Sequence, residues 1–299
     1  MQESIMLFFL NIANPVLDTV ANLVTMFGEE SFVIAFILYI FYNYNKKSGF
    51  ILFTSTLYSV IAMGVLKAIV RAPRPFQVLE SIQGKRVQTA TGYSFPSGHT
   101  TTAASAYTSL ALIFQKRAVS IICALAIALV GISRLYLGVH WPNDVFGGLV
   151  LGASISMLAY RPLALLYDEK EKRIKVNTIV GIVSAAAALI LAILLSLHVV
   201  DEVAFTDLMK VLALGGGGFL GFVFENKRVN FSTDGSWPKK IIRYLIGLGG
   251  VIAIMAAKAL FPASLYAASS FVRYALIGLW ATGLYPLIGT SLRLFSGDR

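Results

Sequence analysis

The sequence is poor in charged residues, in cysteine and in histidine. Only 13% of its 299 residues are charged, one is cysteine and three are histidine. The single cysteine excludes an intramolecular disulfide, and no cluster of Cys, His, Asp or Glu has the spacing of a metal site. No helix is expected to open with a Walker loop or a GxGxxG motif. We therefore expect neither a metal nor an organic cofactor.

What the sequence has in abundance is apolar residues. Hydrophobic residues make up 57% of the chain, and the mean hydropathy is +0.75. These values are too high for a soluble domain of this size, so we predict an all-α, polytopic membrane protein. Apolar runs near the ~20 residues that a membrane helix needs predict spans at roughly 31–45, 50–69, 99–115, 118–138, 144–160, 176–198, 207–225, 241–261 and 270–291.

The first apolar stretch, residues 5–27, is interrupted by polar residues such as Asn14 and Asp18. It fits either an interfacial amphipathic helix or a tilted first span. The first four residues contain no basic residue, so we expect no cleaved signal peptide.

The formal net charge is +10, which raises the question of nucleic-acid binding. The distribution of the basic residues argues against nucleic acid, because they gather mainly in alternate loops. These are Lys46-Lys47, Lys116-Arg117, the stretch 168–175, Lys227-Arg228 with Lys239-Lys240, and Arg293 with Arg299. The positive-inside rule places such loops in the cytoplasm. The loops with Glu29-Glu30 and Asp201-Glu202 then face outward, and we expect a multi-pass protein of the cell membrane.

Two of the histidines lie in polar, turn-forming segments at the edges of apolar runs. His99 follows Pro96-Ser97-Gly98, and His140 precedes Trp141-Pro142-Asn143-Asp144. An imidazole can attack phosphorus or protonate a leaving oxygen. Asp144, four residues after His140, can accept the other ring N–H and fix the tautomer. The two segments therefore point to phosphoryl transfer.

Basic residues surround both histidines in the sequence. Lys67, Arg74 and Arg134 can supply fixed positive charge for the oxygens of a transferring phosphoryl group. Ser97 and Pro142 are also typical of helix starts, and helix N-termini favour an anion. We expect both helices to begin on the same, outward side of the membrane.

Together the segments resemble the signature of the type 2 phosphatidic acid phosphatase superfamily, also called lipid phosphate phosphatases. The Lys-x6-Arg-Pro, Pro-Ser-Gly-His and Ser-Arg-x5-His-x3-Asp blocks are complete and in order between residues 67 and 144. The resemblance implies that His140 is the nucleophile, that Asp144 orients it, and that His99 is the general acid. It also implies a phosphate site made by Lys67, Arg74, Ser97, the Gly98 N–H and Arg134.

Four other basic residues are candidates for contacts to a second phosphate or a lipid head group. Lys85 and Arg86 lie in the polar linker between the first two blocks, where a solvated loop charge is the simpler interpretation. Lys258 and Arg273, like Lys210, fall near the outward ends of later spans. Snorkelling at the interface explains them without a ligand, but no acidic residue close to Lys258 or Arg273 in sequence can pair with either, so a lipid anion is an alternative partner.

The domain organisation follows from the longest charged run. We predict a six-helix phosphatase core at 1–160, a charged cytoplasmic linker at 161–175, and about four additional helices at 176–299. In the last group, glycines 215–218 and 221 occupy one span and glycines 247, 249 and 250 the next. Small residues let membrane helices approach closely, so we predict that these two helices cross; a local break in the first helix is the alternative.

The predicted function is metal-independent hydrolysis of a lipid phosphate or diphosphate at the outer face of the membrane, through a phosphohistidine. Phosphatidate, phosphatidylglycerophosphate and undecaprenyl diphosphate all fit a site for an amphiphile. Two alternatives stay open: a phosphotransferase that passes the phosphoryl group to another lipid, and a lipid transporter with a phosphatase gate.

Overall fold

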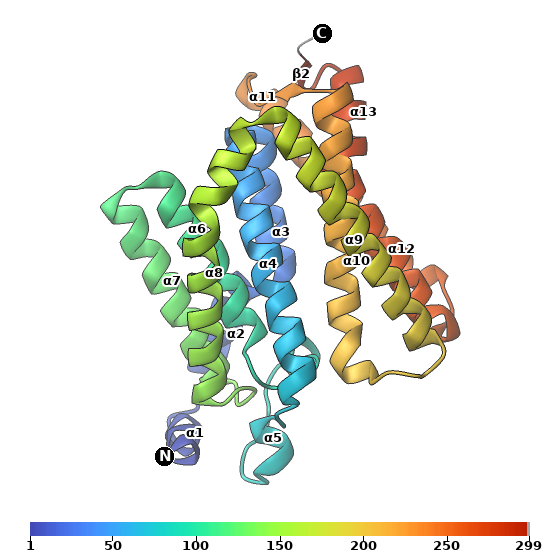
Figure 1. Cartoon of the computed structure of the whole chain (residues 1–299). Helices are drawn as coiled ribbons and strands as arrows, with labels where there is room; N and C mark the ends of the chain where they lie inside the picture. The colour runs from blue at the N-terminus through green and yellow to red at the C-terminus, as the bar shows by residue number, and fades with distance from the viewer. Residues whose placement is uncertain (298–299) are drawn as a thin grey trace. The chain divides into compact units, whose positions relative to one another are not determined.

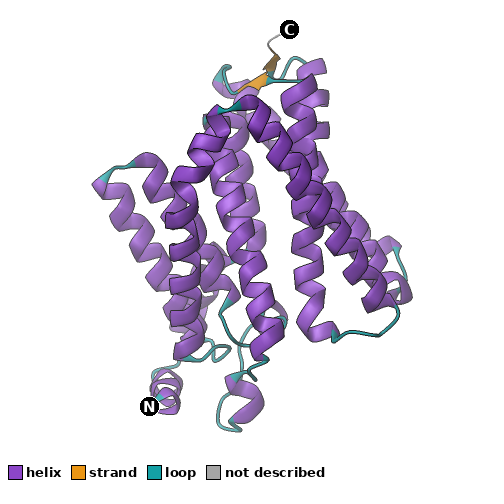
Figure 2. Cartoon of the chain, in the orientation of Figure 1, coloured by secondary structure: helices purple, strands orange, loops and turns teal. Residues whose placement is uncertain are grey.

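The computed structural model describes residues 1–297, so Arg299 of the predicted C-terminal basic pair lies outside the described residues. The described chain is almost entirely helical, as the purple ribbons of Figure 2 show. The strands β1 (Phe231–Ser232) and β2 (Ser296–Gly297) form one short antiparallel pair, with Phe231 opposite Gly297. The predicted all-α class is confirmed.

The chain divides into two compact units, residues 1–34 with 51–162 and residues 35–50 with 163–299. The helices that begin in the first part of the chain are α1 (Gln2–Asn11), α2 (Pro15–Thr25), η1 (Met26–Gly28), α3 (Glu30–Tyr39), η2 (Ile40–Tyr44), α4 (Lys46–Val70), α5 (Pro75–Val78), η3 (Val87–Thr89), α6 (Gly98–Phe114), α7 (Arg117–Tyr136) and α8 (Pro142–Asp168). The later helices are α9 (Lys170–Ser196), α10 (Glu202–Arg228), α11 (Trp237–Ala256), η4 (Ala257–Leu260), η5 (Ala263–Leu265), α12 (Tyr266–Leu279), η6 (Trp280–Leu284) and α13 (Tyr285–Ser291) (Figure 1).

Within residues 1–297, seven helices are long and apolar enough to cross a membrane, and a bent pair, 15–28 with 30–44, makes an eighth candidate. The two halves of this pair meet at 52°. Residues 5–27 form no single helix: α1 ends before Asn14, whose side chain accepts a hydrogen bond from the Leu17 N–H and caps α2. Pro15 opens α2 because the first helical position needs no amide donor.

The first unit is built around α6, whose residues 100–110 are all buried. On one side of α6, the Ser59 hydroxyl of α4 donates to the Ser105 hydroxyl. On the other side, the hydroxyl oxygens of Ser105 and of Ser156 in α8 lie 2.7 Å apart. A Cβ at Gly148 of α8 would lie 2.8 Å from the Ser97 carbonyl oxygen. The missing side chain therefore lets α8 lie against the start of α6, where the predicted phosphate site begins.

The second unit contains the glycine-rich helix α10, and here the predicted pairing is wrong. A Cβ at Gly217 would meet the backbone of Ala275 in α12, and one at Gly221 would lie 3.1 Å from the Leu279 carbonyl oxygen. A Cβ at Gly249 of α11 meets nothing within 4 Å. The glycines thus bring α10 against α12, and α10 is unbroken from Glu202 to Arg228. Small residues predict a close approach but do not identify the partner helix.

The segment predicted as a linker, residues 161–175, is helical except at Glu169, which separates α8 from α9. The second unit also includes residues 35–50, which contribute a buried polar cluster. Lys46 Nζ lies 2.7 Å from the fully buried carboxylate of Glu225, and Arg243 Nε donates to Asn43 at 2.6 Å. Buried charges need such partners, because an unpaired charge in an apolar interior is costly.

Candidate active site

Three segments of the first unit bring the predicted residues together. Lys67 lies in the last turn of α4 and Arg74 directly precedes α5. Ser97 is the N-cap of α6, and His140 lies in the turn before α8. The Ser97 N–H donates to the carbonyl of Asp144 at 2.9 Å. This bond joins the first turns of α6 and α8, so the two predicted helix N-termini meet at one place.

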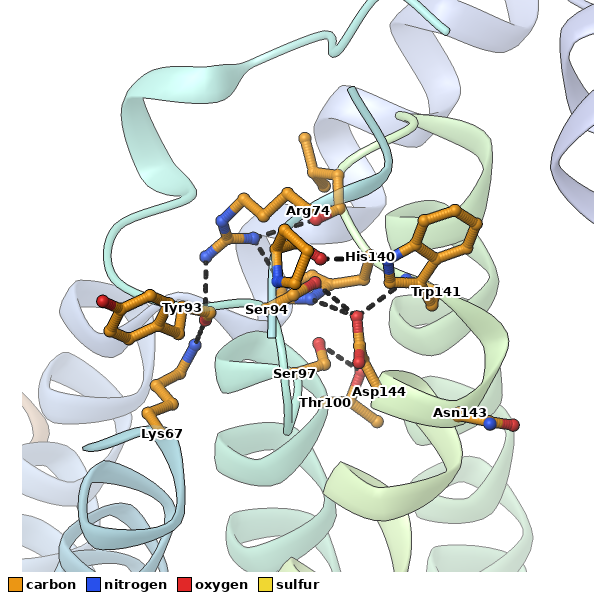
Figure 3. A network of polar contacts seen from close by, with 12 residues as sticks. Lys67, Arg74, Tyr93, Ser94, Ser97, Thr100, His140, Trp141, Asn143 and Asp144 are labelled. Carbon is orange, nitrogen blue, oxygen red and sulfur yellow. Dashed lines mark hydrogen bonds and ion pairs between the residues drawn. The ribbon is translucent and has the colours of Figure 1, made fainter. Parts of the chain in front are cut away.

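His140 is held by both ring nitrogens. Its Nδ1 lies 3.4 Å from Asp144 Oδ2, and its Nε2 lies 3.2 Å from Arg74 Nη1 (Figure 3). A carboxylate accepts only, so Nδ1 carries the proton and Nε2 keeps its lone pair. In the structure this lone pair accepts from Arg74 Nη1. Nε2 can attack an electrophile once that N–H turns to an oxygen of a bound anion.

The carboxylate of Asp144 has two further donors that fix its position. Oδ2 accepts from the Ser94 hydroxyl at 2.5 Å and from the Trp141 backbone N–H at 2.8 Å. Asp144 is 3% exposed and His140 is 1% exposed. A network with this many partners in a dry environment restricts the orientation of the imidazole. Sequence reasoning missed Ser94, because it lies just outside the recognised blocks.

The environment of His140 favours the neutral imidazole. Burial lowers the pKa of His140 well below its ordinary value of 6.5, and the positive charges of Arg74, Arg134 and Lys67 lower the pKa further. A neutral imidazole is the form that attacks phosphorus.

Arg74 and Lys67 are positioned by the loop that precedes α6. Arg74 Nη2 donates to the Thr91 carbonyl at 2.7 Å and Arg74 Nε to the Gly92 carbonyl at 3.1 Å. Lys67 Nζ donates to the Tyr93 carbonyl, which Arg74 also approaches (Figure 3). Both cations are buried: Lys67 is 6% exposed and Arg74 is 2% exposed. The loop carbonyls keep these charges close to His140 before any anion binds.

His99 and Arg134 have polar atoms with no hydrogen-bond partner among the described residues. These are His99 Nε2 and the Nε and Nη2 of Arg134, all buried. Nη1 of Arg134 donates to Thr25 Oγ1 at 2.8 Å. Buried donors without acceptors are rare in native proteins, and an anion with several oxygens would satisfy them. This is the strongest sign that the site is built for a phosphate-like group.

The structure gives Lys85 and Arg86 protein partners. Lys85 Nζ forms an ion pair with Asp18, and Arg86 Nη2 forms one with Glu29 at 2.5 Å. Asp18 lies in α2 and Glu29 directly follows η1, and sequence reasoning did not connect either residue with the site. The predicted contacts at Lys258 and Arg273 belong to the second unit.

Side chains that could hold a metal are sparse. Within residues 1–297, no three Cys, His, Asp or Glu side chains are grouped as metal ligands would be. The donors that surround His140 are guanidinium, ammonium and backbone N–H groups, which bind anions. The donor chemistry therefore fits an oxyanion.

Comparison with known proteins agrees with this chemistry. Residues 48–167 match the PAP2 superfamily, and residues 209–297 match the transmembrane extension of PAP2 superfamily phosphatases. Phosphatidylglycerophosphatase B of Bacillus subtilis is 32% identical over an alignment of 178 positions, which covers 55% of this chain and 81% of the relative. The chain belongs to the PAP2 superfamily. It is a membrane phosphatase of that superfamily, and the resemblance read from the three blocks is confirmed.

Other PAP2 relatives share shorter regions. Undecaprenyl-diphosphatase of Sulfolobus acidocaldarius is 31% identical over 122 residues, covering 41% of this chain and 58% of the relative. Among solved structures, the transmembrane PAP2 type phosphatidylglycerolphosphate phosphatase of Bacillus subtilis is 31% identical with a TM-score of 0.46, covering 53% of this chain and 82% of the other. Aquifex aeolicus LpxE is 24% identical with a TM-score of 0.47, covering 54% and 94%.

Proposed function

We propose that this protein hydrolyses a lipid phosphate or lipid diphosphate through a phosphohistidine on His140, without a metal. The observation that supports the proposal is that both ring nitrogens of His140 have partners: Nδ1 faces Asp144 and Nε2 faces Arg74. When a phosphoryl group binds, its oxygens replace Nε2 as acceptors for the Arg74 guanidinium, and the Nε2 lone pair is then free to attack phosphorus.

The reaction then has two halves. His140 Nε2 attacks phosphorus, the bond from phosphorus to the leaving oxygen breaks, and His99 donates a proton to that oxygen. Water next attacks the phosphohistidine, with neutral His99 accepting its proton, and inorganic phosphate is released. Arg74, Arg134 and Lys67 hold the equatorial oxygens in both halves, together with Ser97 and the Gly98 N–H at the start of α6.

The substrate class follows from the membrane setting and the relatives. The site lies at the end of long apolar helices, which suits an amphiphile whose chains stay in the bilayer. The named relatives are a phosphatidylglycerophosphatase, an undecaprenyl-diphosphatase and lipid A phosphatases. We infer a lipid phosphate or diphosphate substrate for this chain.

The proposal places the site at the outer face of the cell membrane. In the first unit, the site is at the helix ends opposite the Lys116-Arg117 turn between α6 and α7, and the positive-inside rule puts that turn in the cytoplasm. Single cysteines at Gln88 and Glu202 should react with an impermeant thiol reagent added to intact cells, and one at Lys172 should not. Labelling of Lys172→Cys alone would put the site in the cytoplasm.

The activity is tested with purified protein and a panel of lipid monophosphates and diphosphates in the presence of EDTA. We expect release of inorganic phosphate from at least one lipid. Loss of activity with the chelator and rescue by magnesium would contradict a metal-independent reaction. Transfer of the phosphoryl group to a second lipid without phosphate release would show a phosphotransferase.

A further inference from the structure

Lys210 and Lys258 meet at one aromatic ring in the second unit, and with Arg273 of the neighbouring helix α12 they are called the cationic cluster here. Lys210 Nζ of α10 lies 5.6 Å from the ring centre of Tyr266, and Lys258 Nζ of η4 lies 5.5 Å from the same ring. The two ammonium groups therefore share one aromatic ring, which stabilises cations through its electron-rich face. The α9–α10 turn and the segment before α12 lie at the same end of this unit (Figure 1).

Arg273 approaches this cluster from α12. Side chains on a helix tilt toward its N-terminus, so Arg273 points back along α12 toward Ser270, one turn earlier. Its Nη1 lies 3.4 Å from the Met255 carbonyl, one turn before Lys258, and its Nη2 donates to Ser270 at 3.1 Å. Arg273 is 5% exposed, yet its buried Nε has no hydrogen-bond partner among the described residues.

The cluster carries more positive than negative charge. Asp207 pairs with Lys210 at 2.9 Å, and no acidic side chain among residues 1–297 forms an ion pair with Lys258 or Arg273 in the structure. Three cations and one carboxylate leave two positive charges in excess. Charge at the edge of the hydrocarbon region is unfavourable unless an anion compensates it.

The surroundings of the cluster are apolar and exposed. Leu260 is 80% exposed, Leu265 is 50% exposed and Val272 is 48% exposed. In a membrane helix such side chains face acyl chains. A ligand that fits here has an anionic head and apolar tails.

We propose that Lys210, Lys258 and Arg273 bind the phosphate head group of an anionic membrane phospholipid, separately from the site at His140. The phosphate oxygens accept from the ammonium groups and from Arg273 Nε, while the acyl chains lie along the exposed apolar side chains. This site goes beyond the proposed function, because it needs no turnover.

The test is a titration of the full-length protein in detergent with phosphatidylglycerol, in which native mass spectrometry counts bound lipid. Lys258→Gln with Arg273→Gln should raise the apparent Kd about tenfold, a change of 1.4 kcal/mol. The matched control is Lys227→Gln with Arg228→Gln, which removes the same charges from exposed positions and should change Kd less than about twofold.

Further variants and a second lipid distinguish binding of an anionic lipid from a loss of folding and from binding of free phosphate. Lys258 is exposed, so Lys258→Gln alone should fold normally and weaken binding about threefold, while Lys258→Arg should retain it. Phosphatidylcholine should bind the wild type and the double variant equally. Unchanged phosphatidylglycerol binding in the double variant, or displacement of the lipid by millimolar inorganic phosphate, would overturn the lipid site.

A second inference concerns Glu29 and rests on different contacts. Glu29 Oε1 lies 4.0 Å from His99 Nε2, the buried nitrogen without a hydrogen-bond partner. Arg86 holds that carboxylate through Nε at 3.1 Å and Nη2 at 2.5 Å. The guanidinium therefore fixes an acid beside the imidazole that we assign as general acid.

The segment before Glu29 explains how this acid reaches the site. A Cβ at Gly28 would lie 2.8 Å from the His99 carbonyl oxygen and 2.7 Å from Val130. The Tyr107 hydroxyl donates to the Phe27 carbonyl at 2.8 Å. Only glycine allows η1 to lie so close to the first turn of α6, and these residues precede the 48–167 region of the family match.

We propose that Glu29 is a positioning residue for His99, an inference that rests on the proposed function. The groups that face His99 are otherwise basic: Arg134, Arg86, Arg74 and Lys67. The Glu29 carboxylate offsets part of that charge and stabilises the imidazolium that donates a proton to the leaving oxygen.

The test compares leaving groups. Glu29→Gln should lower kcat about tenfold for a lipid phosphate, whose alkoxide must be protonated, and less than about twofold for 4-nitrophenyl phosphate, whose leaving group needs no acid. Glu29→Asp should recover part of the loss. The control is Asp18→Asn, which breaks the comparable pair with Lys85 and should affect both substrates alike.

Equal losses on the two substrates for Glu29→Gln would make Glu29 a structural residue and overturn the inference. Failure of the proposed function would look different, because the wild type would then release no phosphate from any lipid.

Discussion

The hydroxyl of Ser94 donates to Asp144 Oδ2 at 2.5 Å, and this is the same carboxylate oxygen that faces His140 Nδ1. The nucleophile assigned here is thus oriented through a carboxylate that a third side chain holds in place. We predict that Ser94→Ala lowers kcat about tenfold with KM nearly unchanged, because a buried hydrogen bond to a charged group is lost while phosphate contacts remain. Steady-state kinetics on a lipid phosphate measure this; a rise in KM at constant kcat would contradict it.

Asp144→Asn should have a larger effect than Ser94→Ala. An amide side chain can donate to Nδ1 and stabilise the wrong tautomer, so we expect a loss of about 10³-fold or more in kcat, with substrate still bound. The comparison requires that the Asp144→Asn variant folds normally, and thermal melting checks this. A rate within a few-fold of wild type would leave Asp144 as an acid that only complements the N-terminus of α8.

The protonation of His140 gives a prediction about pH. Its pKa is lowered well below 6.5 in the folded protein, so the imidazole should stay neutral at pH 6.5, where a free histidine is half protonated. Above pH 6.5 His140 is neutral in both the folded and the unfolded chain. As the pH falls below 6.5, the free energy of unfolding decreases, because His140 takes up a proton more readily in the unfolded chain than in the folded one. Nitrogen NMR of labelled histidine reports the state directly, and half protonation of His140 at or above pH 6.5 would contradict the prediction.

The glycines of the second unit offer a matched pair of substitutions. Gly217→Leu places a side chain against the backbone of α12, whereas Gly249→Leu adds one where nothing lies within 4 Å. We expect Gly217→Leu to lower the melting temperature by about 5 °C or more and Gly249→Leu to leave it within about 1 °C. Thermal unfolding in detergent distinguishes them, and equal melting of the two variants would refute the close approach of α10 and α12.

The active-site blocks could be interpreted from sequence because each one combines a local fold with its chemistry. Ser97 and Pro142 mark helix starts, and helix starts provide the N–H groups that an anion needs, so the meeting of α6 and α8 follows the sequence pattern closely. Thr25 and Glu29 could not be placed in the same way. Their contacts with Arg134 and His99 join segments far apart in the chain, and no periodicity or spacing encodes such a contact.

The partners of Lys85 and Arg86 could not be predicted from the sequence for the same reason, since Asp18 and Glu29 are more than fifty residues away in the chain. The glycine clusters illustrate a related limit of sequence patterns. A row of small residues indicates that a neighbour comes close, but the choice of α12 over α11 depends on the shapes of all three helices.

The most direct test of the account is the site of covalent phosphorylation. Purified protein mixed with a ³²P-labelled lipid phosphate and quenched in alkali should carry acid-labile label on His140, identified by peptide mapping. His140→Ala should show neither label nor turnover, and His99→Ala should accumulate label with a substrate that has a good leaving group, because water attack on the phosphohistidine is slowed. Label of wild-type intensity in His140→Ala would contradict the assignment of His140 as the nucleophile.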